Sequence, residues 1–398
     1  MALVQCFIEL LGSLFNKICR GDEELAEMFG RLPDCVVIDI LSRLPIDSLV
    51  RFRRDCRDLR ALISSQYFTT LHLSRARPML LLHDCYDPTK HKKRLYVLSE
   101  NVDKKELILR ELYLQPELKI NKHLGLGERS PSPIYSCQGV LLFANKYYWP
   151  RTTYYVLNPI TQEEVIVQHT HHPGRLCAFY FCRGFKLFYA QVRRSWCQYL
   201  VYIFKTQTWR KVRSSCTFNF LPYRGSPAIV NGALHWIVYT YLKKDLPNCA
   251  NGIMVFRMDK EELSAMPHPG RVCKAKQVHE TMRLLVKENC LSFCHLLVSE
   301  LAVYIWILED YEMWAWNKRY KVNICNTRFF PLGLPYGGVP RNVYWWIKFF
   351  YIQDGELVFY YMDSVFSYNL DHKTVKGFKL PQMLFALGTY IKSLVAIA

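Results

Sequence analysis

The sequence lacks any stretch that is both long enough and free enough of charge to span a bilayer. A spanning helix needs about 20 mostly apolar residues, and the best candidate, the apolar run between Leu3 and Ile18, is interrupted by Glu9. No basic residue precedes that run, which argues against a signal peptide. We therefore expect a soluble protein of the cytoplasm or nucleus with no membrane partner. Residues 1–28 would form an amphipathic N-terminal extension.

The sequence also lacks the motifs of common enzyme chemistry. It holds no Gly-rich phosphate loop, no Gly-x-Ser-x-Gly elbow and no His-Glu-x-x-His pair. We therefore expect a non-catalytic protein with no catalytic residues and no cofactor.

Histidine and cysteine residues come near a metal-binding pattern at two places. The first group is His169, His171, His172, Cys177 and Cys182, and the second is Cys290, Cys294 and His295. Neither group has the spacing of a closed four-ligand zinc site. A His-rich surface loop and buried thiols explain them as well, so we expect no metal.

The cysteines lack the spacing of a secreted disulfide framework. There are 15 of them, and the odd number leaves at least one unpaired. A reducing compartment is the simplest environment for such a chain.

Acidic residues are scarce outside the N-terminal part. The chain carries 52 Lys and Arg against 34 Asp and Glu, whereas residues 1–78 hold 11 against 10. A basic, aromatic-rich body raises the hypothesis of nucleic-acid binding. The basic residues are nevertheless dispersed and accompany no nucleic-acid motif, which favours a solvated basic exterior over a nucleic-acid partner.

Two helical patterns occupy the window from Leu32 to Ile63. Apolar residues at helical spacing after Leu32-Pro33 predict a first helix that ends at Leu44. Pro45 disfavours helix in the residue before it, and Asp47 or Ser48 could cap a second helix. The second apolar stripe consists of Leu49, Phe52, Cys56, Leu59, Leu62 and Ile63. Two short helices cannot bury all of their apolar surface on each other, and the apolar surface that remains exposed is typical of a partner site.

The run LPDCVVIDILSRLPIDSLVRFRRDCRDLRALISSQYFTTLHL resembles a plant-type F-box. The shared features are the paired Leu-Pro steps, Ser48-Leu49, Arg51-Phe52, Leu62-Ile63, Phe68 and Leu71-His72-Leu73. The resemblance implies an all-α module over residues 29–75 that binds a Skp-type adaptor and, through it, a cullin. The residues expected at the adaptor contact are Leu32, Pro33, Ile40, Leu41, Leu44, Pro45, Leu49, Phe52 and Leu59.

Two positions depart from the F-box pattern. Leu59 stands where tryptophan is usual, and Asp55 stands where an aliphatic residue is usual. A carboxylate buried at a contact costs several kcal/mol unless it is paired. Helical periodicity also leaves open an ordinary helix pair that packs only on the chain's own core.

The body of the chain repeats a strand, a polar turn and a second strand at a spacing of about 50 residues. The copies lie at residues 154–159, 201–212, 254–258, 303–306 and 365–370. Most follow a shorter strand, at residues 139–142, 232–236, 301–303 and 355–358. Gly139, Gly232 and Gly355 would allow positive φ at tight turns. Four short strands per repeat are typical of a kelch-type propeller blade, and residues 79–398 would hold about six.

Several body segments resemble the F-box-associated domain of plant F-box proteins. They are SCQGVLLF before VLNPITQEE, SPAIVNGALHW before IMVFRMDKEELSAMPHP, IWILEDYEMWAWNKRYKV, and residues 355–380. The pollen S-locus F-box group has the same layout. The expected fold is thus α+β and multidomain: a small all-α F-box followed by an all-β, propeller-like F-box-associated domain over residues 79–398.

The resemblance implies the substrate-recognition subunit of an SCF-type ubiquitin ligase, in which the β domain binds a target protein. We expect target contacts on basic and aromatic loops, because Tyr, Trp and Arg provide contact area and charge-assisted bonds. The candidates are Lys146, Tyr148, Trp149, Arg151, His171, Arg175, Tyr223, Arg224, Tyr336 and Arg341. The alternative is a non-catalytic propeller that binds carbohydrate or nucleic acid and carries a decayed F-box.

Overall fold

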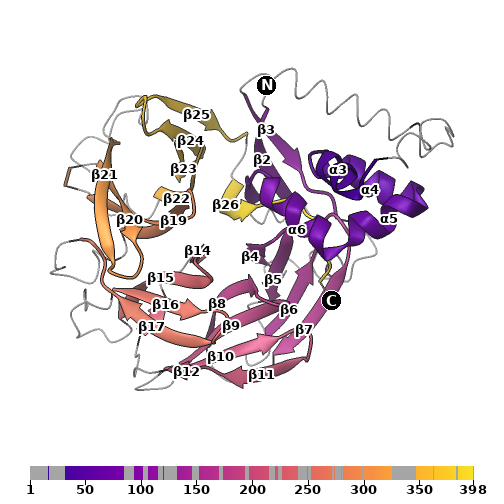
Figure 1. The fold of residues 1–398 in the computed structure, drawn as a ribbon. Helices are drawn as coiled ribbons and strands as arrows, with labels where there is room; N and C mark the ends of the chain where they lie inside the picture. The colour runs from indigo at the N-terminus through magenta and orange to yellow at the C-terminus, as the bar shows by residue number, and fades with distance from the viewer. Residues whose placement is uncertain are drawn as a thin grey trace. The chain divides into compact units, whose positions relative to one another are not determined.

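A computed structural model describes most of the chain (Figure 1). The described residues are 17, 32–84, 94–101, 106–114, 120, 132–145, 152–169, 174–192, 197–214, 220–222, 226–240, 249, 252–270, 273, 279, 281–297, 299–300, 302–324, 347–361, 363–381 and 384–397. Apart from Lys17, the expected extension over residues 1–28 therefore lies outside them. The chain divides into two compact units, residues 1–170 with 387–398 (unit 1) and residues 171–386 (unit 2).

Four helices follow one another in unit 1: α3 (Asp34–Leu41), α4 (Ile46–Asp55), α5 (Arg57–Ser64) and α6 (Gln66–Arg75). We call residues 32–75 the helical module. Pro33 and Pro45 both occupy N-cap positions with extended backbone, and each accepts the first amides of the next helix through its carbonyl oxygen. Only α6 begins with a side-chain cap, where the Ser65 hydroxyl accepts from the Phe68 amide.

Three sequence predictions about these helices are wrong. The first helix ends at Leu41 rather than Leu44, because residues 42–44 form a turn that brings the chain to the extended backbone required before Pro45. The second helix begins at Ile46, so neither Asp47 nor Ser48 caps it. Its apolar stripe is also divided, since the extended backbone of Cys56 separates α4 from α5. No helix among the described residues is long and apolar enough to cross a membrane.

The described strands form six sheets, and two of them belong to unit 1, apart from residues 384–386 at the start of one strand, which belong to unit 2. One has the strand order β26-β1-β2-β3, and the other β4-β5-β6-β7. The first sheet therefore joins a strand near the C-terminus, yellow in Figure 1, to the first strand of the body. The strand bounds are β1 (Met79–Asp84), β2 (Leu95–Asn101), β3 (Glu106–Glu111), β4 (Ser132–Cys137), β5 (Val140–Asn145), β6 (Thr152–Leu157), β7 (Glu164–His169) and β26 (Leu384–Tyr390).

Unit 2 contains the other four sheets. Three are four-stranded antiparallel meanders. The first consists of β8 (Gly174–Phe181), β9 (Phe185–Val192), β10 (Cys197–Ile203) and β11 (Thr208–Lys211), and the second of β18 (Met282–Lys287), β19 (Cys290–Leu297), β20 (Ala302–Asp310) and β21 (Ala315–Asn323). The third consists of β22 (Ile347–Gln353), β23 (Glu356–Tyr361), β24 (Ser364–Asn369) and β25 (Val375–Lys379).

The remaining sheet of unit 2 is larger. It is built from β14 (Ala228–Val230), β15 (Ala233–Thr240), β16 (Ile253–Arg257) and β17 (Glu262–Met266). Two short strands, β12 (Arg213–Ser214) and β13 (Phe220–Pro222), add to it. Strand β12 pairs with β17 in parallel, so the chain leaving β11 crosses directly to the edge of the next sheet.

Tight turns join β4 to β5, β14 to β15 and β22 to β23, at the glycines for which positive φ was predicted. In Gln138-Gly139, Asn231-Gly232 and Asp354-Gly355 both residues have positive φ, between 48° and 82°. Two such residues form the type I′ turn, whose twist matches that of antiparallel strands. The glycine takes a backbone conformation that would strain other residues.

The predicted repeats correspond to the sheets, and the organisation into blades of four short strands is confirmed. One assignment was wrong. Residues 301–303 are not a separate strand, because β20 runs unbroken from Ala302 to Asp310. The strand that precedes it is β19, which contains Cys290, Cys294 and His295.

Apolar side chains pack between neighbouring sheets within each unit. Trp236, only 3% exposed, lies in the core shared by the β8–β11 and β14–β17 sheets. Trp306 is half-buried against the next core along the chain. Trp209 is half-buried too, and its ring contacts Tyr189 and Tyr202 of its own sheet.

Candidate adaptor-binding site

The helical module has a core of its own. Leu41, Leu44, Leu49 and Phe52 are at most 2% exposed and pack with Ile46, Ile63 and Phe68. The first four side chains were expected at the adaptor contact, and the structure places them in the core of the module rather than on its exposed surface. They are needed to hold the helices together, and they can influence a partner only through the shape of the module.

A different set of apolar side chains faces solvent. Leu32 is 38% exposed, Val36 39% and Val50 37%, and Pro33 and Pro45 are exposed as well. Leu32 precedes the N-cap Pro33, and Val36 lies in the first turn of α3. Ile40, one turn further on, is half-buried, as is Leu59. We call Leu32, Pro33, Val36, Pro45 and Val50 the open face of the module.

The two departures from the F-box pattern lie in different environments. Asp55 is exposed at the end of α4, where its carboxylate pairs with Arg54 at 2.7 Å. The hydrogen bond from Arg54 lowers the pKa of Asp55, so the side chain is charged and solvated rather than buried. Leu59 packs against the core of the module without being fully covered.

An ionic cluster joins the two ends of the module. Asp39 in α3 accepts from Arg43 at 3.1 Å and from Arg75 of α6 at 2.7 Å. These hydrogen bonds, first Arg43 and then Arg75, lower the pKa of Asp39. Arg75 also donates to the Ser42 hydroxyl. Buried His72 lies 3.3 Å from the Leu44 carbonyl oxygen through Nε2, so α6 supports the turn that separates α3 from α4.

Residues 391–397, which we call the C-terminal tail, complete this core from the far end of the sequence. Leu394 is 5% exposed and packs among the core side chains of the helical module, and Ile160 packs against the same cluster. The Lys392 ammonium lies 3.5 Å from the Asp47 carboxylate of α4. The tail therefore links the helical module to the sheet of β4–β7 within unit 1.

Asn158, at the end of β6, holds the tail in place. Its side-chain nitrogen donates to the carbonyl oxygens of Ser393 at 3.1 Å and Val395 at 2.7 Å. Its side-chain oxygen accepts from the Ile160 amide at 2.9 Å, which stabilises the turn into β7. Asn158 is fully buried, so water cannot replace these bonds.

Most of the residues expected to contact a target lie outside the described residues. Arg175 is described, but it is a half-buried residue of strand β8, paired with Ala190, and not a loop residue. The others lie outside the described residues: Lys146, Tyr148, Trp149, Arg151, His171, Tyr223, Arg224, Tyr336 and Arg341.

The His and Cys groups considered from sequence do not converge on one point in the described part of the chain. Cys177 and Cys294 are buried, and burial raises the pKa of each thiol to about 12. Cys182 contacts the Met258 carbonyl oxygen, 3.6 Å away. His171 and His172 lie outside the described residues.

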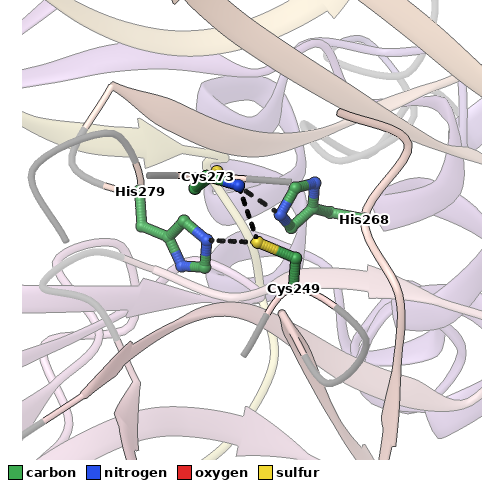
Figure 2. Close-up of side chains that lie close together, drawn as sticks. All are labelled: Cys249, His268, Cys273 and His279. Carbon is green, nitrogen blue, oxygen red and sulfur yellow. Dashed lines mark hydrogen bonds between the residues drawn. The ribbon is translucent and has the colours of Figure 1, made fainter. Parts of the chain in front are cut away.

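A different His and Cys cluster lies in unit 2 (Figure 2). The ligand atoms of Cys249, His268, Cys273 and His279 all lie within 4.8 Å of one another. Sequence reasoning missed it because its members are separated by 18, 4 and 5 residues, with none of the short Cys-x-x-Cys pairs that reveal zinc sites. Only the fold brings Cys249 to the other three.

Two regions of the chain match known protein families. Residues 29–71 match the F-box domain, and residues 89–397 match the F-box associated beta propeller domain. F-box protein At3g07870 of Arabidopsis thaliana is 24% identical over 340 residues, which cover 76% of this chain and 74% of that protein. F-box/kelch-repeat protein At3g23880 of the same plant is 23% identical over 316 residues, covering 75% and 81%.

Among solved structures, a chain of the nidogen/laminin complex gives a TM-score of 0.44 at 12% identity, covering 79% of this chain and 98% of that one. That likeness is too low to bear on function. The family matches, by contrast, span the helical module and nearly all of the body. This chain therefore belongs to the F-box proteins that carry an F-box-associated β-propeller domain, and its six sheets are the blades of that domain.

Proposed function

We propose that this protein is the substrate-recognition subunit of an SCF-type ubiquitin ligase. The F-box binds a Skp-type adaptor, which connects it to a cullin, and the β domain binds a target protein. The protein itself performs no chemistry. It raises the effective concentration of the target's lysines near the ubiquitin-carrying enzyme.

The open face of the F-box is the observation that supports this proposal best. Exposed apolar side chains on a small helical module are candidates for an interaction surface, and the family to which the module belongs points to the adaptor as occupant. The core side chains beneath, such as Leu41 and Phe52, keep α3 and α4 in position to present that face.

Adaptor co-purification with full-length variants tests the proposal. Val36→Asp leaves the core untouched and places a carboxylate on the open face. Burial of a valine side chain stabilises a contact by about 1.5 kcal/mol, so the loss alone corresponds to about tenfold in affinity. The buried charge adds to that loss.

Ile229→Asp is the matched control. Ile229 is another exposed β-branched residue, 45% exposed in strand β14 of unit 2, and its replacement should leave adaptor binding unchanged. Equal binding by the parent and Val36→Asp would contradict the proposed contact. Failure of the parent itself to bind any Skp-type adaptor would favour the alternative of a propeller with a decayed F-box.

The target can be sought with the same pair of variants. Proteins captured by the parent in the presence of a proteasome inhibitor should become ubiquitinated in cells that express the parent or Ile229→Asp. In cells that express Val36→Asp they should be captured but not modified, because only the link to the ligase is broken.

A further inference from the structure

The His and Cys cluster of unit 2 occupies the long connection between two blades. His268 follows β17, His279 precedes β18, and Cys273 lies between them. Cys249 comes from the earlier connection between β15 and β16. The four side chains thus join two separate connections to each other.

The cluster lies at the edge of an apolar core. Cys273 belongs to the core between the β14–β17 and β18–β21 sheets, together with Met266, Met282 and Phe293, and Cys249 packs against it. His268 is 6% exposed, His279 3% and Cys273 6%. Two imidazoles gathered with two thiols at such a site are costly unless each polar atom has a partner.

Two of the distances between ligand atoms match those around a tetrahedral metal ion. Zinc bonds of about 2.3 Å to sulfur and about 2.05 Å to nitrogen, at a tetrahedral angle, place the two ligand atoms about 3.6 Å apart. Cys249 Sγ lies 3.6 Å from His279 Nε2, and Cys273 Sγ lies 3.8 Å from His268 Nε2. The two His–Cys pairs therefore already have the separation that a bound zinc ion requires.

The surroundings of His279 prepare it as a ligand. Its Nδ1 lies 3.0 Å from the Val238 carbonyl oxygen, which can only accept, so Nδ1 carries the proton. Nε2 is then the nitrogen with a free lone pair, and it faces Cys249. A backbone carbonyl that fixes the tautomer in this way is the usual second partner of a metal-bound histidine.

His268 is held by close packing. Its ring stacks on Phe293 at 5.6 Å between centroids, and a Cβ at Gly252 would lie 2.4 Å from its Cδ2 atom. Glycine at 252 is therefore required for the ring to reach Cys273. The Gly270 amide donates to Nδ1, and it must turn away when the ring proton moves there upon ligation through Nε2.

We propose that one zinc ion binds in unit 2 between four side chains: Cys249, His268, Cys273 and His279. A Cys₂His₂ set with all four positions filled by protein is a structural site rather than a catalytic one. Binding releases the two thiol protons to solvent. The ion then fastens the connection between β17 and β18 to the one that precedes β16, and so fixes how two neighbouring blades are joined.

Metal content and cobalt spectroscopy of the full-length protein, purified under reducing conditions, test the proposal. We expect about one zinc per chain. Replacement by Co²⁺ should give the strong visible absorption of tetrahedral cobalt and a near-ultraviolet thiolate charge-transfer band. Cys273→Ala and His279→Gln should reduce the zinc content at least about fivefold, since each removes one of four ligands.

Two variants outside the cluster separate metal loss from general destabilisation. Cys294→Ala removes a fully buried thiol and His295→Gln a buried imidazole, both from strand β19. Both should retain the zinc of the parent. Gly252→Ala replaces no ligand, yet it should weaken zinc binding, because its Cβ would displace the His268 ring.

Three results would overturn the proposal. The first is a reduced parent protein that holds no zinc and takes up no cobalt. The second is zinc whose amount is the same in Cys273→Ala and His279→Gln as in the parent, which would place the metal elsewhere. The third is a Cys249–Cys273 disulfide in protein isolated without added oxidant, seen as a mass two units lower.

Discussion

Asn158→Asp is a sharp test of how the C-terminal tail is attached to the rest of unit 1. The substitution keeps the size of the side chain and keeps one oxygen to accept from the Ile160 amide. It replaces the donating nitrogen by an oxygen, which then faces the carbonyl oxygens of Ser393 and Val395. Two hydrogen bonds become two contacts between acceptors.

The free-energy cost of Asn158→Asp follows from the burial of the side chain. Each lost hydrogen bond is worth about 1 kcal/mol, and a buried carbonyl left without a donor costs about 1–3 kcal/mol. Because Asn158 is 0% exposed, we expect the tail to be destabilised by about 2–4 kcal/mol. Hydrogen exchange from the tail should accelerate by about 30- to 700-fold, at tenfold per 1.4 kcal/mol.

The assay is amide hydrogen exchange of the peptide that contains residues 391–397, read by mass spectrometry. The Val395 and Ile397 amides are useful reporters, because they donate to Ser393 Oγ at 2.9 Å and to the Glu163 carboxylate at 3.0 Å. Both bonds depend on the position of the tail.

Asn369→Asp is the matched control. Asn369 begins the same kind of turn between β24 and β25, and its side-chain oxygen accepts from the Asp371 and His372 amides. Aspartate performs this role at Asp310, whose carboxylate accepts from the amides of Glu312 and Met313. The control substitution should therefore lower the stability of the protein little. Equal exchange from the tail in the two variants would refute the reasoning.

Three further predictions concern other sites. Gly139→Ala should release the tail, because the new Cβ would lie 2.4 Å from the Cβ of Ser393. Gly232→Ala is the control, since Gly232 has a similar φ but lies in open space. Chemical denaturation of this control should show a loss of only about 1 kcal/mol, from backbone strain. Burial lowers the pKa of His235 to about 4, below its unfolded value of about 6.5. The contribution of His235 to the free energy of unfolding should therefore be fully present above pH 6.5 and should fall by about 1.4 kcal/mol at pH 5.5. His235→Gln should flatten that dependence, as unfolding midpoints between pH 7.5 and 5 would reveal; an unchanged slope would contradict it. Asp55→Val with Leu59→Trp should strengthen adaptor binding in a titration if those positions border the contact, and unchanged affinity would show that they do not.

The helical module shows what sequence periodicity can and cannot determine. The apolar spacing identified its buried side chains, but it could not say which of them face each other and which face outward. Leu44 and Val36 are both aliphatic residues of the same short segment, yet one is 2% exposed and the other 39%. The difference depends on α4, α6 and the tail, whose packing no local pattern contains.

The body shows a similar division. Short-range features, such as the turn at Asn231-Gly232, were predictable because two residues determine the backbone conformation. The cluster around Cys249 was not, since its ligands are up to 30 residues apart and no regular spacing connects them. The attachment of Leu394 to the helical module joins residues even further apart in sequence.

Under the proposed function the protein acts by proximity, and the attachment of the tail then bears on how well it does so. Effective concentration depends on how narrowly the F-box and the β domain are held relative to each other, and within unit 1 the tail connects the helical module to the β4–β7 sheet. Spin labels on unnatural amino acids at Tyr67 and Tyr113, both 67% exposed in unit 1, can report that restraint through pulsed electron resonance. We expect one narrow distance distribution in the parent and in Asn369→Asp, and a broader one in Asn158→Asp. A distribution that stays narrow after the tail has been released would mean that the chain segment between α6 and β1 is sufficient to hold the module, and that the tail adds stability without setting geometry.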